Sequence, residues 1–416
     1  MEITPKLILL ESFKLAVEAA LPDKVLPRYL PMDKSEPAIV IGAGKAAASM
    51  AASFEKNWDG PVSGMVVTPY GHKENCKYIN VVEAAHPTPD HVSKTFAKDL
   101  LNLTKNLTEN DNVYVLLSGG GSSLLSLPAS GIEFDDKKFI NNVLLKSGAS
   151  IDEINTVRKH LSQIKGGRLA ANCYPANIHT YIISDVMGND PSVVASGPTV
   201  ADPTTSAEAT AIIKKYKIDI PNSIASWLND PLSESIKPNN PLLKKEKLII
   251  IASAKDALAA AKNYSEKLGI NCINLSEIGG DARKLGKEHG IMALTMKPKK
   301  PTLLLSGGET TVSVNGNGKG GRNTEYLLSL ALTLNGAKNV YAISADTDGI
   351  DGSEDNAGAY IDYTTLKKAA LQNINLLEKL NNNDSYSAFH SLGDLIKIGP
   401  TRTNVNDFRA ILILPD

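Results

Sequence analysis

Hydrophobic residues along the chain fall into short strand-like runs that alternate with helical patterns. Apolar residues at helical spacing predict an amphipathic helix from Lys6 to Ala20, ending at Leu21-Pro22. Strand-like runs then follow at 38–41, 64–68, 78–83, 113–117 and 181–184. Strands that alternate with helices favour parallel βαβ units, so this part of the chain predicts a doubly wound α/β domain.

A second series of strands and helices fills the rest of the chain. Its strand-like runs lie at 248–252, 271–275, 302–305, 340–344 and 410–414. Four prolines between Ile218 and Lys247, with few periodic apolar residues, mark the best candidate for an inter-domain connection. We therefore expect domains at 1–240 and 241–416, with the helix in 1–22 a candidate to pack on the second domain.

Length and composition describe an ordinary soluble globular protein. The 416 residues exceed what one core usually holds, and 42% apolar with 21% charged residues excludes a disordered chain. A net charge of −1 gives no general attraction for nucleic acid, so we expect no nucleic-acid partner. Three distant cysteines, no signal peptide and no membrane-length apolar run predict a cytoplasmic protein without membrane association. A homodimer is left open.

One short phrase occurs twice, each time at the end of a strand-like run. Leu116 to Gly120 continues into Gly121-Ser122-Ser123, whereas Leu304 to Gly308 repeats the same residues and continues into Glu309. Glycines let a backbone approach a ligand, and a following helix start attracts negative charge. We therefore expect an anion in a cleft between two α/β domains. The first copy, with Ser118, Gly119, Gly120, Gly121, Ser122 and Ser123, is the candidate phosphate cradle. It is not a Walker A loop, and a close-packed βα turn is the alternative.

A second glycine turn lies earlier in the chain. Gly42-Ala43-Gly44-Lys45 stands where a dinucleotide fingerprint would lie, but the third glycine position holds Ala47. No acidic residue ends the next strand to bind a ribose, so a tight strand–helix turn is an open alternative. Lys45 opposes the dipole of the following helix, which favours an anion there.

A basic segment follows a capping box that begins at Ser150. We expect its helix to run to Gly166-Gly167, with Arg158 and Lys165 on one face. A solvated basic face and a cluster that faces a substrate carboxylate or phosphate are both open. His160 is a base or, more commonly for a lone histidine, structural.

Acidic residues follow several predicted strands. Asp185 ends a strand, where it could accept a substrate proton or hold Mg²⁺, or cap the next turn; Asp190 follows it. The run from Asp346 to Gly352 departs from a calcium loop because Ile350 stands at an acidic position. Carboxylates at strand ends, including Glu309, suit Mg²⁺ bound together with nucleotide phosphates. Arg322 lies beside a glycine-rich turn that we expect to be a mobile cationic loop.

Together these motifs resemble, from one end of the chain to the other, the glycerate 2-kinase family (glycerate kinase type II), whose carboxyl-terminal part is the MOFRL domain. Further motifs carry the resemblance: 157–162, 165–167, 184–186, 196–199, 307–311, 320–323, 346–349 and 403–407. The resemblance implies two α/β domains flanking a cleft, with the larger, N-terminal one Rossmann-like and built on a parallel sheet. It also implies ATP- and Mg²⁺-dependent phosphorylation of D-glycerate on its 2-hydroxyl, giving 2-phosphoglycerate. The chain departs from the family's usual residues at Ser123, Asn189, Thr324 and Arg402.

We expect each candidate residue to have a defined role. Lys45, Asp185 and Arg322 are the catalytic candidates, with Asp185 as proton acceptor. Asn404 joins the loop 118–123 in nucleotide binding, and Arg158 joins Lys45 and Arg322 in substrate binding. The metal candidates are Asp190, Glu309, Asp346 and Asp351.

Two other classes of function are open. An oxidoreductase acting on hydroxypyruvate would need NADH, and the incomplete dinucleotide fingerprint argues against it. A non-catalytic sensor of phosphorylated sugars would not need the carboxylates at Glu309, Asp346 and Asp351.

Overall fold

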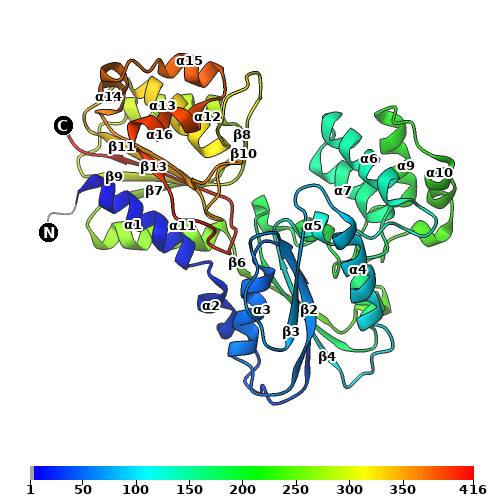
Figure 1. The fold of residues 1–416 in the computed structure, drawn as a ribbon. Helices are drawn as coiled ribbons and strands as arrows, with labels where there is room; N and C mark the ends of the chain where they lie inside the picture. Colours follow the sequence, from blue (N-terminus) through cyan, green and yellow to red (C-terminus); the bar gives the residue numbers. More distant parts are fainter. Residues whose placement is uncertain (1–3) are drawn as a thin grey trace. The chain divides into compact units, whose positions relative to one another are not determined.

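The computed structural model describes residues 4–416, which divide into two compact units. The first along the chain, residues 25–251, is called here the parallel-sheet unit. Residues 4–24 and 252–416 form the mixed-sheet unit. Figure 1 shows the elements of both units, each of which is described by itself below.

The parallel-sheet unit is built on a six-stranded sheet with the order β3-β2-β1-β4-β5-β6. Its first five strands pair in parallel. The strands are β1 (Ala38–Ala43), β2 (Val62–Pro69), β3 (Ile79–Ala84), β4 (Asn112–Ser118), β5 (Asn177–Ile183) and β6 (Glu246–Ala252). The order reverses between β1 and β4, and open α/β sheets bind ligands at such a switch point. The predicted parallel α/β domain is confirmed.

Helices surround this sheet and also form a separate helical layer. The helices of the unit are α3 (Ala47–Lys56), α4 (His91–Leu103), α5 (Gly121–Leu124), α6 (Phe134–Lys146), α7 (Ile151–His160), α8 (Arg168–Cys173), α9 (Ser206–Lys215) and α10 (Asn222–Leu228). Short 3₁₀ turns lie at Leu26–Arg28, Met187–Asn189, Val194–Ser196, Pro231–Ser233 and Pro241–Leu243. The helices α6, α7, α9 and α10 gather away from the sheet around a core of their own (Figure 1).

The mixed-sheet unit has a six-stranded sheet with the order β13-β12-β11-β14-β9-β7. The strands β7 and β9 are parallel, while β14 runs antiparallel between β9 and β11. The strands are β7 (Asn271–Glu277), β9 (Thr302–Gly307), β11 (Val340–Asp346), β12 (Gly358–Ile361), β13 (Leu395–Ile396) and β14 (Asp407–Ile413); β8 (Gly280–Asp281) and β10 (Thr310–Thr311) pair separately.

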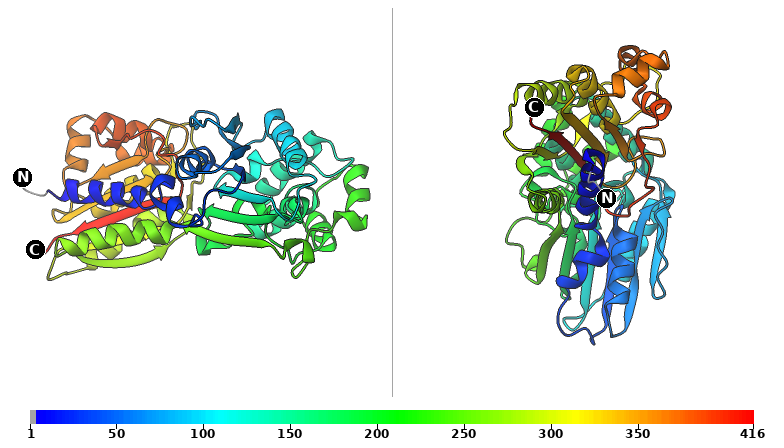
Figure 2. Two further views of the ribbon diagram at one scale, coloured as in Figure 1. Left: turned by 90° about the horizontal axis from the view of Figure 1, so that it is seen from below. Right: turned by 90° about the vertical axis from the view of Figure 1, so that its left-hand side faces the viewer.

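Helices cover both faces of this second sheet. They are α1 (Pro5–Glu18), α11 (Ala254–Lys267), α12 (Ala282–Thr295), α13 (Arg322–Leu334), α14 (Thr365–Leu371), α15 (Leu376–Asn381) and α16 (Ser385–Leu392). The short helix α2 (Pro22–Val25) lies where the chain passes from one unit to the other. Figures 1 and 2 show α1 beside α11 on one face, with α12 to α16 over the other. Alternate residues of β14 explain this, because Phe408 packs on Phe13 of α1 while Ile411 joins the core under α13.

Three sequence predictions differ from the structure. The strand at 248–252, expected to open the second series, is part of β6 at the edge of the first sheet. The proline-rich segment 218–247 lies inside the parallel-sheet unit and includes α10. The helix that begins after Ser150 ends at His160 rather than at Gly166, because residues 161–167 turn to meet the segment 196–198.

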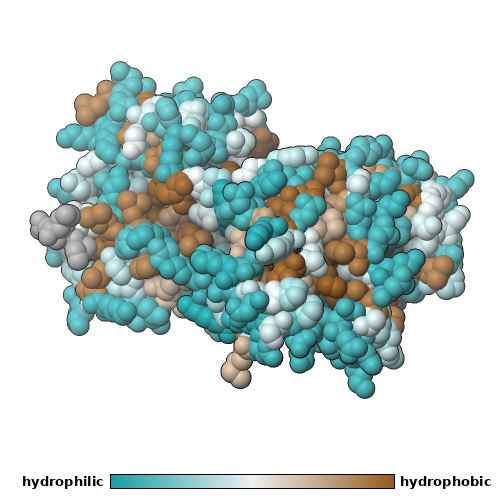
Figure 3. Space-filling view, turned by 60° about the horizontal axis from the view of Figure 1, so that its bottom comes forward, coloured by the Kyte–Doolittle hydropathy of each residue, from teal (hydrophilic) through white to brown (hydrophobic). Residues whose placement is uncertain are grey.

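Within residues 4–416, no helix is both long enough and apolar enough to span a membrane. Figure 3 shows hydrophobic residues in several areas of one face, set among hydrophilic ones.

Candidate functional site

The glycine turn after β1 and the glycine loop after β4 are joined at the switch point of the parallel sheet. The N–H of Lys45 donates to the carbonyl of Gly119 at 2.8 Å, and the N–H of Ala46 donates to Ser118 Oγ at 2.9 Å. The two predicted motifs therefore form one structural feature, with Lys45 at the start of α3.

Glycine is required at two positions of this feature. Gly44 has φ +136°, and a Cβ there would lie 2.2 Å from Ser118 Oγ. Gly120 has φ +79°, and a Cβ there would lie 3.1 Å from the His86 ring. A side chain at Gly44 would separate the two loops, and one at Gly120 would press against His86, so the first glycine permits the close approach of the loops.

The hydroxyls of the Ser118–Ser123 loop are engaged within the protein. Ser118 is fully buried, and its hydroxyl bonds to the turn after β1. Ser122 Oγ lies 2.8 Å from Ser196 Oγ, and Ser123 Oγ lies 2.8 Å from His86 Nδ1. Backbone N–H groups rather than serine hydroxyls are therefore the better candidates for phosphate donors in this loop.

Lys165 ties the glycine loop to the strained turn at 194–197. Its Nζ donates to the carbonyl of Ser122 at 2.7 Å, to Ser122 Oγ at 3.1 Å and to the carbonyl of Ala195 at 3.3 Å. Ala195 and Ser196 have φ of +52° and +60°, a conformation that costs energy for residues with a Cβ. Lys165 is only 2% exposed, so the solvated basic face proposed from sequence is wrong for this residue.

Two more cations lie on the helices beside this turn. Arg158 of α7 donates through Nε to Asn141 of α6, and Lys137 of α6 donates to the carbonyl of Leu127 at 3.1 Å. Lys137 is 8% exposed. Its burial, together with nearby guanidinium charges, lowers its pKa to about 7.

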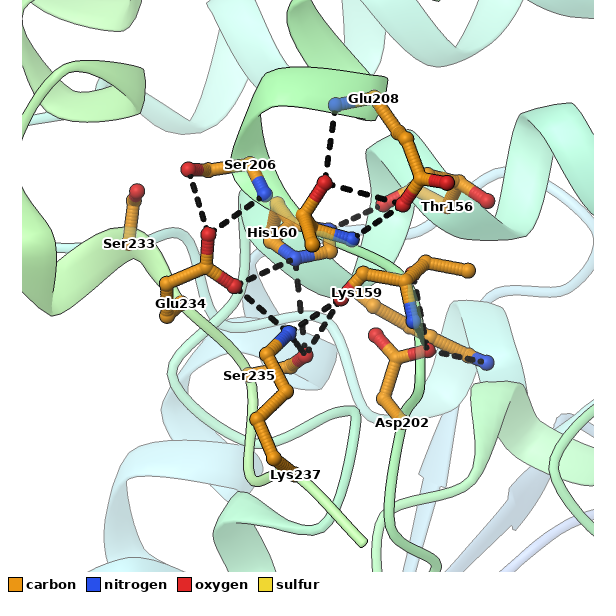
Figure 4. Close-up of polar contacts among 12 residues, drawn as sticks. Thr156, Lys159, His160, Asp202, Ser206, Glu208, Ser233, Glu234, Ser235 and Lys237 are labelled. Carbon is orange, nitrogen blue, oxygen red and sulfur yellow. Dashed lines mark hydrogen bonds and ion pairs between the residues drawn. The ribbon is translucent and has the colours of Figure 1, made fainter.

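Figure 4 shows the polar side chains around His160, which is fully buried. Its Nδ1 lies 2.8 Å from the carbonyl oxygen of Thr156, and its Nε2 lies 3.5 Å from Ser235 Oγ and 3.7 Å from Glu234. Lys237 pairs with Glu234 at 2.6 Å. Burial lowers the pKa of His160, which favours the neutral ring. These contacts fit the structural alternative for His160.

Lys159, next to His160, is also held in the interior. It forms an ion pair with Asp202 at 3.3 Å, where both side chains are buried. Arg168 donates to the carbonyl of Lys159 and to that of Ser233, which joins α8 to the segment after α10. Lys159 therefore pairs with an acid, unlike Lys137, Arg158 and Lys165.

The two acidic candidates of the parallel-sheet unit lie after β5. Asp185 lies two residues after the strand ends and is partly buried. Asp190 is exposed, and its Oδ1 accepts the N–H of Ser192 at 2.8 Å in a turn. Asp185 therefore lies near the carboxyl end of a parallel strand and Asp190 lies in the loop that follows, as expected from sequence.

Arg322 of the mixed-sheet unit contacts three carboxylates. Its three guanidinium nitrogens lie 3.0 Å from Glu309, 2.7 Å from Asp346 and 2.7 Å from Asp407. Burial lowers the pKa of Arg322, but the carboxylates more than offset this and raise it. Arg409 also pairs with Asp407, so two cations among three carboxylates leave one negative charge, and the cluster attracts cations more readily than phosphate.

Asp407 is the member of the Arg322 cluster that sequence reasoning did not single out, although it ends the motif at 403–407. It also accepts from Asn323 Nδ2 at 2.8 Å and pairs at 3.2 Å with Arg409, which is 1% exposed. Its place at the start of an apolar strand was the available signal. Asn404, the nucleotide candidate of the same segment, is buried, and its Oδ1 accepts the N–H of Asn406.

Asp351 caps the start of α13. One oxygen accepts from the N–H of Asn323 at 2.9 Å, and the other accepts from the N–H and hydroxyl of Thr324. Burial raises the pKa of this carboxyl. A metal ion at Asp351 would compete with these bonds, so its predicted role as a ligand stays a prediction.

The glycine-rich loop before α13 is packed rather than free. Gly318 N–H donates to the carbonyl of Asn382 at 2.9 Å, and Lys319 N–H donates to Asp384 at 3.0 Å. A Cβ at Gly318 would lie 2.4 Å from that of Asp384. These contacts differ from the expected mobile loop. A cavity of about 320 Å³ beside the loop is lined by Thr310, Arg322, Glu325 and Asn383 among others.

The oxygen donors of the Arg322 cluster suit a hard cation such as Mg²⁺. Glu309 is half exposed. Asp346 is the last residue of β11 and contacts the same guanidinium. Within residues 4–416, no three or more His, Cys, Asp or Glu side chains group closely enough to hold a metal by themselves.

The chain resembles known proteins over nearly its full length. Residues 8–229 match a domain of unknown function (DUF4147), and residues 302–407 match the MOFRL family. A protein of Agrobacterium vitis provisionally named hydroxypyruvate reductase is 44% identical over 99% of this chain and 95% of its own. The D-glycerate 2-kinase of Thermotoga maritima is 40% identical over 98% of each chain.

Solved structures agree with this result. The crystal structure of a glycerate kinase from Thermotoga maritima superposes with a TM-score of 0.89 and 39% identity, over 97% of this chain and 98% of that one. Identity and coverage at this level extend through both units, as do the motifs described above. The chain therefore belongs to the MOFRL family of glycerate kinases.

Proposed function

We propose that this protein transfers the γ-phosphoryl group of ATP to the 2-hydroxyl of D-glycerate, giving 2-phosphoglycerate and ADP in a Mg²⁺-dependent reaction. The observation that carries the proposal is the joined Lys45 turn and Ser118–Ser123 loop at the switch point of the parallel sheet. The Thermotoga relative named D-glycerate 2-kinase supports the choice of acceptor and of product.

In the parallel-sheet unit, the proposed work is binding and proton transfer. The backbone of the Ser118–Ser123 loop binds phosphate oxygens, and the Lys45 ammonium neutralises the phosphoryl group or the glycerate carboxylate. Arg158 binds the substrate, because a guanidinium matches carboxylate geometry. The 2-hydroxyl oxygen bonds to the γ-phosphorus as the bond from that phosphorus to the leaving ADP oxygen breaks. The hydroxyl proton passes to the Asp185 carboxylate.

In the mixed-sheet unit, the proposed work is the placing of charge. Glu309 and Asp346 would hold Mg²⁺, and Asp190 and Asp351 stay predicted metal ligands. When bound, the ion supplies charge neutralisation on the phosphates. Arg322 keeps its predicted catalytic and substrate-binding role, and its three carboxylates fix the direction of the guanidinium. Asn404 stays a predicted nucleotide contact.

Reduction of hydroxypyruvate is the second candidate, because relatives of similar identity carry that provisional name. The strand order of the parallel sheet is also the one found in dinucleotide-binding folds. Two features argue against NADH binding. The third glycine position of the fingerprint holds Ala47, and β2 ends at Thr68-Pro69 without an acidic residue to bind a ribose.

One assay separates the candidates. The protein is incubated with ATP, Mg²⁺ and D-glycerate, and the product is tested with enolase, which accepts 2-phosphoglycerate but not the 3-isomer. A parallel sample with NADH and hydroxypyruvate lacks ATP. Enolase-competent product supports the proposal, whereas oxidation of NADH without ATP supports the reductase. A protein that binds phosphorylated sugars and turns over neither substrate would be a sensor.

A further inference from the structure

The parallel-sheet unit keeps three cations in its interior without an acidic partner. Lys137 and Lys165 are 8% and 2% exposed, and Arg158 is partly buried. Across residues 4–416, the polar partners of these three side chains are carbonyls, one hydroxyl and one amide oxygen. Neutral oxygens satisfy hydrogen bonds but do not cancel charge.

The three cations interact with one another. The positive charges of Lys137 and Arg158, after the larger effect of burial, lower the pKa of Lys165. A shared acceptor also links their elements: the Leu127 carbonyl receives both Lys137 Nζ and the hydroxyl of Ser162, three residues before Lys165. Like charges that are buried together cost free energy unless an anion compensates them.

Lys159 provides the internal comparison. It is buried to the same degree as Lys137, yet it pairs with Asp202 at 3.3 Å. The fold can therefore supply an acid to a buried lysine of this region, and it leaves Lys137, Arg158 and Lys165 without one.

We propose that Lys137, Arg158 and Lys165 form a buried subsite for an oxyanion of the substrates. The group is the carboxylate of the hydroxy acid or a phosphate of the nucleotide, an assignment that rests on the proposed function. Leu127 is the one polar partner of Lys137 Nζ, and Asn141 the one partner of the Arg158 guanidinium, within the described chain. Both cations thus have N–H groups left to donate to an oxyanion. Lys165 contributes charge, because its three donors already hold the glycine loop and the strained turn.

The position of the subsite supports this assignment. Lys165 bonds to Ser122 in the loop after β4. This loop lies at the carboxyl ends of the parallel strands, where ligands of open α/β folds bind. Arg158 is partly exposed, so an anion can reach it from solvent. The glycines of the motif at 165–167 fix the backbone beside Lys165, because their N–H groups bond to the carbonyls of Ser196 and Gly197.

The test measures binding and stability separately. Calorimetry on the full-length protein gives the Kd of D-glycerate, of ATP and of inorganic phosphate for wild type, Lys137→Met and Arg158→Met. Thermal unfolding without ligand gives the stability of each variant. The matched control is Lys138→Met, since Lys138 neighbours Lys137 on α6 but pairs with Asp135 at 2.9 Å. Lys165→Met is left out because it would also break three hydrogen bonds.

We expect Lys137→Met and Arg158→Met to weaken one ligand by about tenfold or more, the loss typical of a charge-assisted hydrogen bond. The Tm of Lys137→Met should be unchanged or higher, because the variant removes an uncompensated buried charge. Weaker binding of D-glycerate with unchanged binding of ATP would assign the carboxylate to the subsite. Weaker binding of ATP and phosphate with unchanged binding of D-glycerate would assign a phosphate to it. Both results support the subsite.

Two results would overturn it. Unchanged Kd values for all three probes in both variants would remove the subsite, as would a lower Tm with unchanged binding, which indicates a structural role. A wild-type protein that binds D-glycerate or phosphate but makes no 2-phosphoglycerate would overturn the proposed function and leave the subsite standing.

Discussion

The cluster of Lys137, Arg158 and Lys165 in one unit and the Arg322 cluster in the other have opposite surroundings. In the parallel-sheet unit, Lys137 and Lys165 are buried against neutral oxygens. In the mixed-sheet unit, Arg322 contacts three carboxylates and Asp407 adds a second arginine to the cluster. A buried cation without an acid favours an anionic ligand, whereas an arginine among acids favours a fixed framework that still carries negative charge.

The repeated Leu-Leu-Ser-Gly-Gly phrase follows the same division. Ser118 Oγ accepts from the backbone of Ala46 and so joins the glycine turn after β1 to the glycine loop after β4. Ser306 Oγ accepts from the Arg409 guanidinium at 3.3 Å and so joins the acidic cluster. Identical residues end β4 and β9, but the loop after the first is uncharged and the loop after the second begins with Glu309.

Arg322→Ala should produce the largest effect and test the framework side of the comparison. The variant leaves Asp346 and Asp407 buried near each other without their shared cation, so we expect a loss of about 3 kcal/mol in unfolding free energy. Turnover should fall about 100-fold or more. Urea unfolding and kcat measurements check both. Arg322→Lys keeps the charge without the planar guanidinium, so its stability and turnover should fall between those of wild type and Arg322→Ala. A fully stable, active alanine variant would contradict the framework role.

Lys45→Ala should reduce activity as strongly but leave the fold intact. We expect kcat/KM to fall about 100-fold or more, because the ammonium is proposed to neutralise charge that develops during transfer. The Tm should change little, since the backbone N–H of residue 45 still bonds to Gly119. Lys98→Ala on the exposed side of α4 is the control. Near-normal turnover in both Lys45→Ala and Arg322→Ala would make the site assignment wrong.

Acid should weaken the mixed-sheet unit through His289. Burial, with Arg409 nearby, lowers the pKa of His289 to about 4, and its Nδ1 lies 2.8 Å from the Tyr326 hydroxyl. Between pH 6.5 and 4 the unfolded chain binds a proton that the folded chain does not, so stability falls as pH falls through this window. We expect about 1–3 kcal/mol from this group. Unfolding of wild type and His289→Gln at pH 7 and pH 4.5 measures it, and parallel pH slopes for the two proteins would exclude the effect.

Asp351→Asn should cost less and separate capping from metal binding. The amide can still accept one set of bonds from the start of α13, so we expect a loss of about 1–2 kcal/mol. The dependence of activity on Mg²⁺ concentration should stay the same if the carboxylate serves α13 alone. A rise of about tenfold in the Mg²⁺ requirement would instead support Asp351 as a ligand.

Glu309→Gln should have the smallest effect on stability. Its carboxylate is half exposed, so its ion pair with Arg322 contributes at most about 1 kcal/mol. The expected result is an unchanged Tm with a higher Mg²⁺ requirement, measured by titration of the metal in the kinase assay. A large fall in Tm would place Glu309 in the framework with Asp407.

The local features of this protein were readable from its sequence. Apolar periodicity located β1 to β5 and most strands of the second sheet within a few residues, because strand and helix patterns depend on neighbours along the chain. The two glycine motifs and Lys45 were found for the same reason, since a turn that needs glycine marks itself locally. The family also follows from such local motifs taken in order.

Tertiary structure decided which charges meet. Arg322 pairs with Asp407, 85 residues away in sequence, because β14 inserts antiparallel between β9 and β11. Lys165 reaches Ser122 because the chain turns after His160 instead of continuing as a helix. Edge strand β6 joined the first sheet through pairing that no residue pattern specifies. Periodicity and turn chemistry act over a few residues, whereas the partner of a buried charge depends on which distant strands become neighbours.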